Sequence, residues 1–555
     1  MSKKGKKFSL LLASLLMVFS TACSSGGDSK STANGTDSKK EAEQAAAVDP
    51  SKPSWKNDTS PITFDWYINF AWYTGTDWGK DLTSQYVTKK TGVNLNFVVP
   101  AGNEAEKMNT MIASGKLPDF VTIAWSDDAV KKMIEGKLVL PLNELAEKYD
   151  PYFISKVADP AKLSWYTQED GNVYGYPNAS SSPADFEKYG DNYISNQTFV
   201  VRKDMYEAIG SPDMRTPEGF LAALKAAKEK FPDVNGQPMI PIGLHEFTDN
   251  GNYSLESYLQ NFLAIPQEKD GKLYDRQTDP EYIKWLKVFR QANQDGLLAK
   301  DVFIDKRAQM EEKIAQGRYF AMMYQRSDFS NPQNVLFSKD PNSVYIAVDG
   351  PSNAAMDQPT LSGPVISGWT LTLISKDVKD KARAISFLEY LTSEEGQRDL
   401  YMGEEGVTYD MKGDKPVFKP EVLDLLNKDR AAFDTKYGAS HKYWMMMDTN
   451  VTDQWAPEAV APFKQLADWT RGKTVSASQF DQINPTGNSK EGIANTKLGQ
   501  LWGKTLPKLL MASSDAEFDQ LWSDYQAKRE STGLADVQTY QQTEYEKNLK
   551  KLGIK

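Results

Sequence analysis

From residue 62 onward, short apolar runs alternate with longer amphipathic ones. Residues 62–68, 93–99 and 120–124 have the alternating or continuous apolar pattern of strands, whereas residues 77–90 and 105–114 have the apolar spacing of helices. Glycines follow both helical segments, at Gly92 and Gly115, where this residue commonly ends a helix. Alternating strands and helices predict parallel β–α–β units and therefore a doubly wound α/β lobe.

A second set of strands and helices follows a segment rich in Tyr, Gly and Pro at residues 165–177, which we interpret as a crossing between two lobes. The pattern predicts strands at 199–202, 320–324 and 344–348 and helices at 216–230, 255–263, 280–295 and 307–316. Residues 351–364 predict the return crossing. Strand 370–374 and helix 380–392 are then expected to rejoin the first lobe, and the chain from about residue 415 reads as mostly helical.

The beginning of the chain has the pattern of an export signal. Residues 1–22 contain a basic start, an apolar run at 8–19 that is too short to span a bilayer, and small residues directly before Cys23. This order resembles a bacterial lipobox, and we predict that Cys23 carries a lipid. The alternative is an ordinary secretory signal with a chance cysteine. Residues 23–58 are expected to form a flexible tether, because residues 24–52 contain almost no large apolar side chains.

Composition narrows the possible functions. The 555 residues exceed what one hydrophobic core normally holds. The chain carries 65 basic and 75 acidic residues, and loss of residues 1–22 removes four lysines and no acids, which takes the net charge from −10 to −14. This balance argues against nucleic acid as a partner and against membrane contact other than through the lipid. A single cysteine and two histidines, His245 and His441, exclude intramolecular disulfides and Cys- or His-rich metal centres.

Several segments, in order, resemble the extracellular solute-binding proteins of the maltose-binding type. They are Ala-Ser-Gly-Lys-Leu-Pro-Asp at 113–119, Gly-Asn-Val-Tyr-Gly-Tyr-Pro at 171–177, Arg-Lys-Asp at 202–204 with Thr-Pro-Glu-Gly-Phe at 216–220, Gly-Arg-Tyr-Phe-Ala-Met at 317–322 and Leu-Glu-Tyr-Leu-Thr-Ser-Glu-Glu-Gly at 388–396. Gly-Val-Thr-Tyr at 406–409 resembles the large lipoprotein subgroup that serves oligosaccharide ABC importers in Gram-positive bacteria.

The resemblance implies a two-lobed periplasmic-binding-protein-like (Venus-flytrap) α/β fold with interlobe crossovers and a helical C-terminal region. The expected N-terminal lobe comprises 59–178 and 352–408, and the C-terminal lobe comprises 179–351 and 409–555. The implied function is that of a monomeric, non-enzymatic lipoprotein on the extracellular face of the cell membrane. It would bind an oligosaccharide between its lobes and deliver it to the ABC transporter permease.

Aromatic side chains are the main candidates for ligand contacts, because a sugar ring presents apolar C–H faces to flat rings and hydroxyl groups to polar side chains. Open parallel sheets bind ligands at the carboxyl ends of their strands. This rule selects as stacking candidates Trp72, Trp78, Trp125, Tyr176, Trp369 and Trp444, and as polar candidates Asp127, His245, Arg326 and Glu405. Each tryptophan has a core position as its alternative. For His245 the alternative is a structural role, and for Arg326 an ordinary salt bridge.

No metal or cofactor is expected. Alginate-binding relatives carry a calcium loop after the helix that corresponds to 216–230, and here only Asp233 and Asn235 remain of its ligands. With Gly236 as the sixth loop position, Phe231 and Ile242 would occupy the first and twelfth, where calcium needs oxygen ligands. We predict that this loop binds no calcium.

Two other functions stay open at this stage. A surface-anchored glycoside hydrolase needs only a pair of carboxylates, which the composition permits. A peptide-binding or sensor-linked protein would use the same fold. The chain has no Gly-x-Ser-x-Gly nucleophile motif and no phosphate-binding loop to favour other enzyme classes.

Overall fold

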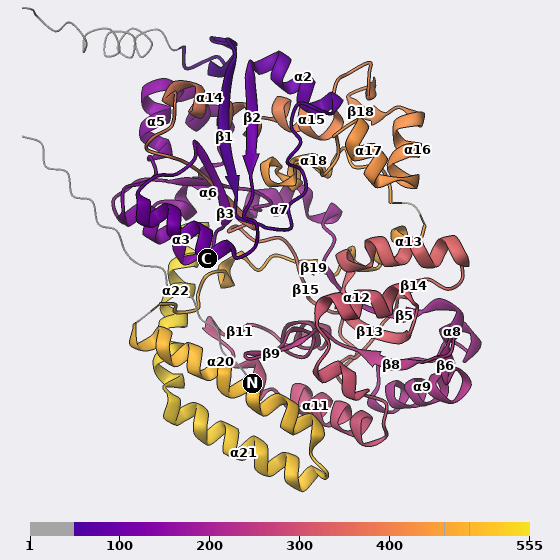
Figure 1. Ribbon diagram of the computed structural model, residues 1–555. Coiled ribbons are helices and arrows are strands. Elements are labelled where there is room, and N and C mark those ends of the chain that lie inside the picture. Colours follow the sequence, from indigo (N-terminus) through magenta and orange to yellow (C-terminus); the bar gives the residue numbers. More distant parts are fainter. Residues whose placement is uncertain (1–48, 460, 488, 555) are drawn as a thin grey trace, which may run out of the picture. The chain divides into compact units, whose positions relative to one another are not determined.

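The computed structural model describes residues 49–459, 461–487 and 489–554. The predicted signal, Cys23 and most of the predicted tether lie outside these residues. Within them, two mixed sheets with separate hydrophobic cores form two lobes (Figure 1). The two-lobed α/β architecture expected from the resemblance is confirmed.

The sheet of the first lobe has the order β2-β1-β3-β16-β4. Its strands are β1 (Ile62–Ile68), β2 (Val93–Val98), β3 (Phe120–Ala124), β4 (Gly175–Pro177) and β16 (Thr370–Ile374). Strand β1 is parallel to β2 and β3, whereas β16 is antiparallel to β3 and β4. Because β16 comes after the second lobe in the chain, the return crossing at 351–364 brings the chain back as expected.

Helix α2 (Leu82–Thr91) begins five residues later than the apolar spacing predicts. The side chain of Asp81 accepts a hydrogen bond from the Ser84 N–H at 2.8 Å, and this N-cap defines the first turn. The helix ends at Gly92, with φ 74°, where a Cβ would lie 2.1 Å from the Thr59 carbonyl oxygen. Only glycine fits this turn into β2.

The other helices of the first lobe lie around its sheet, apart from α16 and α17, which lie beyond α15 (Figure 1). They are α3 (Glu104–Ser114), α4 (Asp128–Glu135), α5 (Leu142–Tyr149), α6 (Pro160–Tyr166), α14 (Lys381–Thr392), α15 (Glu394–Met402), α16 (Pro420–Lys428), α17 (Arg430–Lys436) and α18 (Thr449–Thr452). Helix α7 (Pro183–Tyr189) lies in the first crossing between the lobes.

The sheet of the second lobe has the order β14-β5-β13-β8. Its strands are β5 (Gln197–Arg202), β8 (Ile240–Gly243), β13 (Tyr319–Gln325) and β14 (Tyr345–Ala347). The helices of this lobe include α8 (Lys203–Ala208), α9 (Pro217–Lys230), α10 (Leu259–Phe262), α11 (Pro280–Gln294), α12 (Arg307–Ala315), α13 (Ser330–Lys339) and α19 (Phe463–Thr470). Trp285 of α11 is fully buried in this core and donates its indole N–H to the Ser352 carbonyl at 2.9 Å.

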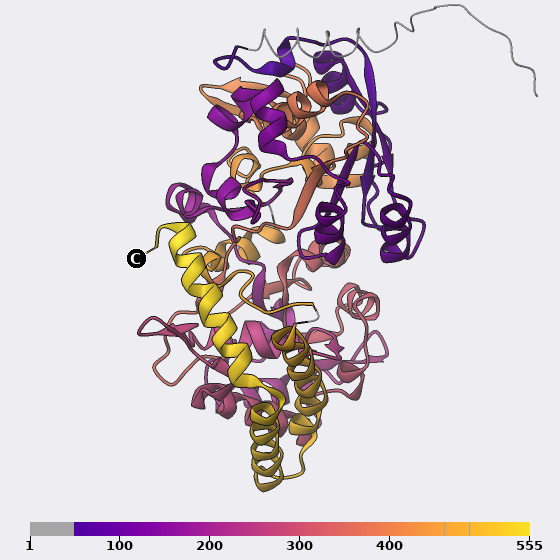
Figure 2. The same cartoon turned by 90° about the vertical axis from the view of Figure 1, so that its left-hand side faces the viewer.

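The last three helices are α20 (Lys490–Met511), α21 (Asp515–Thr532) and α22 (Leu534–Leu552), and Figure 2 shows them in yellow at the end of the chain. Helix α20 packs on α11 and on both other helices. Helix α22 also contacts α6 of the first lobe, where Lys551 lies 5.5 Å from the ring centre of Trp165. Among the described residues, no helix has the length and apolar character needed to cross a bilayer.

The segment that follows residue 409 packs with the first lobe, not with the second as the sequence predicts. It forms the hairpin of β17 (Tyr409–Lys412) and β18 (Lys415–Phe418), and its side chains from Tyr409 to Met447 share a core with Phe64 and Phe120. The chain joins the core of the second lobe only further on, through Leu466 of α19. Local apolar spacing marks a buried face without indicating which core that face joins, which explains the difference.

Regular structure also begins earlier than the tether prediction implies. A short 3₁₀ turn, η1 (Ser54–Lys56), places Trp55 in the first core, where its ring meets Tyr390 edge-on at 4.9 Å. Lys56 forms an ion pair with Glu395 at 3.1 Å. Burial of the indole and this ion pair together stabilise the segment in its position against α14.

We expect Trp55→Ala to lower the free energy of unfolding by about 3 kcal/mol, because it removes a large buried ring and leaves a cavity against Tyr390. Urea denaturation of the chain from residue 49 onward measures this change. Trp72→Ala, at a residue that is 56% exposed, is the control and should change the stability by less than about 1 kcal/mol. Equal effects of the two substitutions would contradict the assignment of Trp55 to the core.

Candidate functional site

Strand geometry brings three of the predicted tryptophans to one edge of the first sheet. Strands β1 and β3 are parallel, so their carboxyl ends, which precede Trp72 and Trp125, lie at the same edge. Strand β16 is antiparallel to β3, so the residue before it, Trp369, is at that edge too. The Trp125 N–H donates to the Trp369 carbonyl at 3.2 Å.

Trp72, Trp369 and Trp444 form a stack that we call the tryptophan cluster. The Trp369 and Trp444 ring centres are 4.3 Å apart with planes 17° from parallel. Trp72 lies 5.6 Å from Trp444 and 5.9 Å from Trp369, at 15° and 9°. Phe70 lies within 6 Å of all three rings at tilted angles. The three indoles therefore present nearly parallel faces.

The cluster is unusual in its exposure. Trp72 is 56% exposed and Trp369 is 43% exposed, and no other tryptophan of the described residues is among the exposed large apolar side chains. Exposing apolar rings to water is unfavourable. Exposed aromatic side chains that gather at a sheet edge are therefore typical of a binding site. Flat parallel rings suit a ligand with apolar faces, such as a sugar.

Asn178 fixes the backbone of the segments that carry Trp369 and Trp444. Its amide N–H donates to the Trp444 carbonyl at 3.3 Å, and its side-chain oxygen accepts from the Thr370 N–H at 2.9 Å. Its backbone carbonyl accepts from the Trp369 N–H at 3.2 Å. Gly368, with φ 62°, permits this approach because a Cβ there would lie 2.1 Å from the Asn178 oxygen. Three distant segments are thus fixed to one another by a buried amide.

Two further candidates lie next to the cluster. Trp125 is partly covered, and its indole N–H donates to the Gly368 carbonyl at 3.1 Å. Asp127 caps α4 by accepting a hydrogen bond from the Ala129 N–H at 2.8 Å. Both side chains are therefore held by local structure beside Trp369.

Three candidates lie elsewhere. Trp78 is buried in the first core, where it meets Tyr443 edge-on at 4.9 Å and donates to the Thr88 hydroxyl. Tyr176 is buried too, and its hydroxyl accepts from the Asp159 N–H at 3.1 Å. Glu405 is exposed in the turn between α15 and β17. Trp78 thus takes the core position that was its alternative, and Tyr176 is buried as well.

His245 and Arg326 follow β8 and β13, which are parallel, so both lie at one edge of the second sheet. Tyr253, which the sequence analysis missed, is 54% exposed there and meets His245 edge-on at 5.4 Å. No strand-end pattern precedes Tyr253, so only its exposure identifies it. An exposed ring beside partly buried polar groups makes this edge a second candidate ligand surface.

The imidazole of His245 is held in one tautomer. The Ser254 hydroxyl donates its proton to the Met323 carbonyl at 2.5 Å. His245 Nδ1 lies 2.7 Å from the same hydroxyl oxygen. Because the hydroxyl has no second proton to donate, Nδ1 must carry the proton of this hydrogen bond. His245 Nε2 is then an acceptor, and it is buried without a partner. Burial lowers the pKa of His245 to about 4, so the ring is neutral at physiological pH.

Arg326 and Asp453 interact electrostatically. Asp453 follows α18, which packs on α15 in the first lobe, and sequence analysis did not select it. Burial lowers the pKa of Arg326, and the charge of Asp453 opposes that shift. Loss of hydration raises the pKa of Asp453 to about 6, against the opposing effect of Arg326. The predicted polar candidate Arg326 is thus coupled to a carboxyl group of the other lobe.

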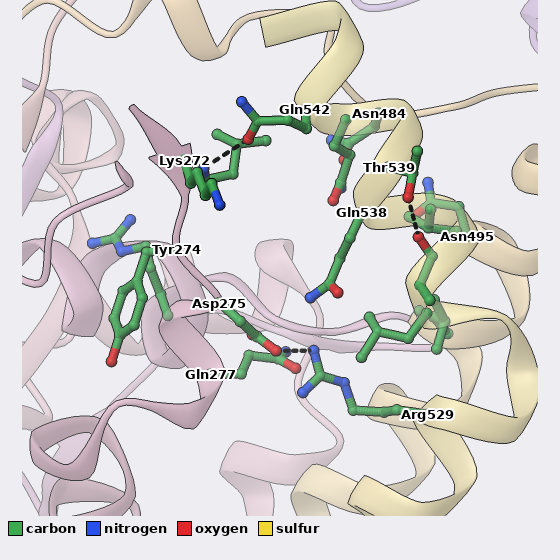
Figure 3. Close-up of a pocket in the computed structure, with 18 of the residues that line it drawn as sticks. Lys272, Tyr274, Asp275, Gln277, Asn484, Asn495, Arg529, Gln538, Thr539 and Gln542 are labelled. Atoms are coloured by element: carbon green, nitrogen blue, oxygen red, sulfur yellow. Dashed lines mark hydrogen bonds and ion pairs between the residues drawn. The ribbon is translucent and has the colours of Figure 1, made fainter. Parts of the chain in front are cut away.

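A separate cavity of about 1150 Å³ lies in the second lobe (Figure 3). It is open to solvent on one side and is lined by the hairpin of β11 (Glu268–Lys269) and β12 (Lys272–Leu273), the turn that follows it, and helices α20 to α22. No member of the tryptophan cluster lines it.

In the part of the chain that the structure describes, no three His, Cys, Asp or Glu side chains form a group able to hold a metal ion. At the degenerate calcium loop, β6 (Asp233–Val234) and β7 (Gln237–Pro238) form a tight hairpin. The Asp233 side chain accepts from the Gly236 N–H at 3.1 Å. That carboxylate therefore serves the turn, and the absence of calcium binding stays a prediction.

Comparison with solved structures identifies the fold. The two-lobed fold aligns with that of the Streptococcus pneumoniae substrate-binding protein FusA in complex with kestose, at a TM-score of 0.62 and 17% identity over 88% of this chain and 99% of FusA. It also aligns with the alginate-binding protein AlgQ2 without calcium, at 0.59 and 20% over 88% and 98%. At these identities the likeness shows the fold alone.

The sequence establishes the family. A family model described as bacterial extracellular solute-binding protein matches residues 83–409, which is more than half of the chain, and the chain belongs to this family. It is 24% identical over 336 residues to lipoprotein LipO of Bacillus subtilis, an alignment that covers 58% of this chain and 63% of LipO. It is 27% identical over 241 residues to FusA, a fructooligosaccharide ABC transporter substrate-binding protein, covering 41% and 43%. The chain thus aligns with less than two-thirds of either relative.

We expect His245 to make the protein less stable in acid. Its folded pKa of about 4 lies below the ordinary value of 6.5, so between these pH values the unfolded chain binds a proton that the folded chain does not. Its contribution to the free energy of unfolding is fully present above pH 6.5 and falls by up to about 3 kcal/mol as the pH approaches 4.

The measurement is urea denaturation at several pH values for the natural chain and for His245→Asn, which keeps a donor for Ser254. Between pH 6.5 and 4 the variant should lose less stability than the natural chain. The carboxyl groups titrate in both proteins and cancel in the comparison. Parallel pH profiles would contradict the assigned state of His245.

Proposed function

We propose that this protein is the substrate-binding component of an ABC importer and that it binds an oligosaccharide on the tryptophan cluster. The observation that carries the proposal is the stack of Trp72, Trp369 and Trp444, whose parallel faces are partly open to solvent at the carboxyl edge of a sheet. The family supports a role in binding rather than in catalysis. Relatives named for fructooligosaccharide and polygalacturonan/rhamnogalacturonan binding support a sugar as the ligand.

In the mechanism that we propose, sugar rings stack with their C–H faces against the indoles, and polar groups bind their hydroxyls. Tyr253, His245 and Arg326, at the sheet edge of the second lobe, supply the opposing contacts when the lobes close. His245 Nε2, a buried acceptor without a partner, is suited to a sugar hydroxyl donor. A ligand that touches both lobes only in the closed form stabilises that form, which the permease then recognises.

Attachment to the membrane completes the proposal. A lipid on Cys23 and the polar tether that follows would hold a monomeric, anionic body beside the permease on the extracellular face, without direct contact with the bilayer. The relative LipO is named as a lipoprotein, which supports this arrangement.

Trp369→Ala is expected to weaken oligosaccharide binding by about 10-fold or more, because it removes one of the two exposed rings of the stacking surface. A glycan array identifies the ligand, and isothermal titration then measures its affinity. Trp469→Ala is the control, since Trp469 packs on Phe262 in the second lobe. Unchanged affinity in a folded Trp369→Ala protein would remove the cluster from the site.

Cys23→Ala is expected to release the protein from the cell. Without the thiol no lipid can be attached, and the described part of the chain contains no helix that could replace the anchor. Fractionation of a Gram-positive host that expresses each form compares membrane and medium. Equal membrane retention of both forms would show that Cys23 is not the attachment point.

A further inference from the structure

The cavity in the second lobe is built from elements that are far apart in the sequence. Its lining combines the β11–β12 hairpin and the turn up to Gln277 with α20, the end of α21 and the first half of α22. Figure 3 shows the hairpin side and the helix side facing each other across the open space. Its volume of about 1150 Å³ is just above the range of about 300–1,000 Å³ that is typical of pockets for small ligands.

Carboxamides are the commonest side chains on the lining. Eight of them contribute to it, among them Gln277, Asn484, Asn495, Gln538 and Gln542. A carboxamide both donates and accepts hydrogen bonds, as does each hydroxyl of a sugar, so the two kinds of group are complementary. Trp502 and Tyr525, whose ring centres are 5.1 Å apart, add aromatic surface to the same lining.

Charges on the lining largely cancel. Asp275, after the hairpin, and Arg529 of α21 form an ion pair at 2.7 Å, which joins the two sides of the cavity in Figure 3. Glu256 accepts from the Trp502 indole at 2.6 Å, and burial raises the pKa of this carboxyl group to about 7. A pocket with little net charge favours an uncharged ligand over an ionic one.

Two polar groups of the lining lack protein partners although they are buried. Gln260 is only 7% exposed, and its amide makes no hydrogen bond with the described part of the chain. Arg276 Nε is buried and without a partner as well. Both groups are therefore available to hydrogen-bond to a polar molecule in the cavity. Gln538 of α22, on the helix side of the cavity, is exposed and makes no side-chain hydrogen bond with the described part of the chain.

We propose that this cavity is a second saccharide-binding site, specific for uncharged sugars and separate from the tryptophan cluster. Gln260 and Gln538 each bind a hydroxyl group of the saccharide. Because the elements that form it belong to the second lobe, the site does not require the lobes to close. The proposal is independent of which ligand the tryptophan cluster takes.

The test uses the mature chain with Trp72→Ala and Trp369→Ala, which removes the two exposed rings of the cluster. This protein is screened on an array of neutral and acidic oligosaccharides, and the strongest neutral ligand is titrated calorimetrically. Two further variants are made in the same background: Gln538→Arg, which places a charged side chain in the cavity, and Gln260→Leu, which replaces the buried amide by an apolar group of similar size. Gln520→Arg is the control, because Gln520 is exposed on α21 outside the cavity.

The expected result is binding of a neutral saccharide that Gln538→Arg and Gln260→Leu each weaken by at least 10-fold and that Gln520→Arg changes by less than twofold. Three results would overturn the proposal: no neutral saccharide binds in this background, acidic ones bind in preference, or a folded Gln538→Arg protein binds as before. None of these affects the proposed function, which is tested by the single change Trp369→Ala in the otherwise natural chain.

Discussion

The pairing of β16 with β3 and β4 is the interaction on which the first lobe depends. This strand arrives after the chain has built most of the second lobe, and it completes the sheet by running antiparallel to both neighbours. The pairing sets Trp369 beside the ends of β1 and β3. Asn178, directly after β4, then ties the start of β16 to the loop of Trp444. The exposed aromatic surface is therefore a consequence of sheet topology.

The segment at 409–447 has a related role. By packing in the first core it supplies Met445, Met446 and Met447 to that core and leaves the ring of Trp444 on its outer edge. The buried neighbours hold the backbone of this loop, so the stacking partner of Trp369 is rigidly supported. The second lobe, by contrast, has a cavity in which carboxamides are the commonest side chains. The two surfaces thus offer different chemistry to a ligand.

Much of the fold was predictable because its signals are local. The strands at 62–68, 120–124 and 370–374 coincide with their apolar runs. Trp72 follows the carboxyl end of β1, whereas Trp369 reaches the same edge only because β16 runs antiparallel to β3. Helix α2 was misplaced at its start because the Asp81 side chain, rather than apolar spacing, defines its first turn. The strand-end rule also selected Trp78, but its ring packs inward against Tyr443, a residue more than 360 positions away in the chain.

The sequence by itself determined the α/β class, the two lobes, the family resemblance and the aromatic character of the candidate site, since these follow from periodicity, residue type and motif order. Only the tertiary structure decided which core residues 409–447 join, which tryptophans remain exposed, and that Tyr253 stands beside His245. It also brought Gln260 and Gln538 to one cavity. Burial and the meeting of distant residues depend on long-range packing, which the local pattern of a single sequence does not encode.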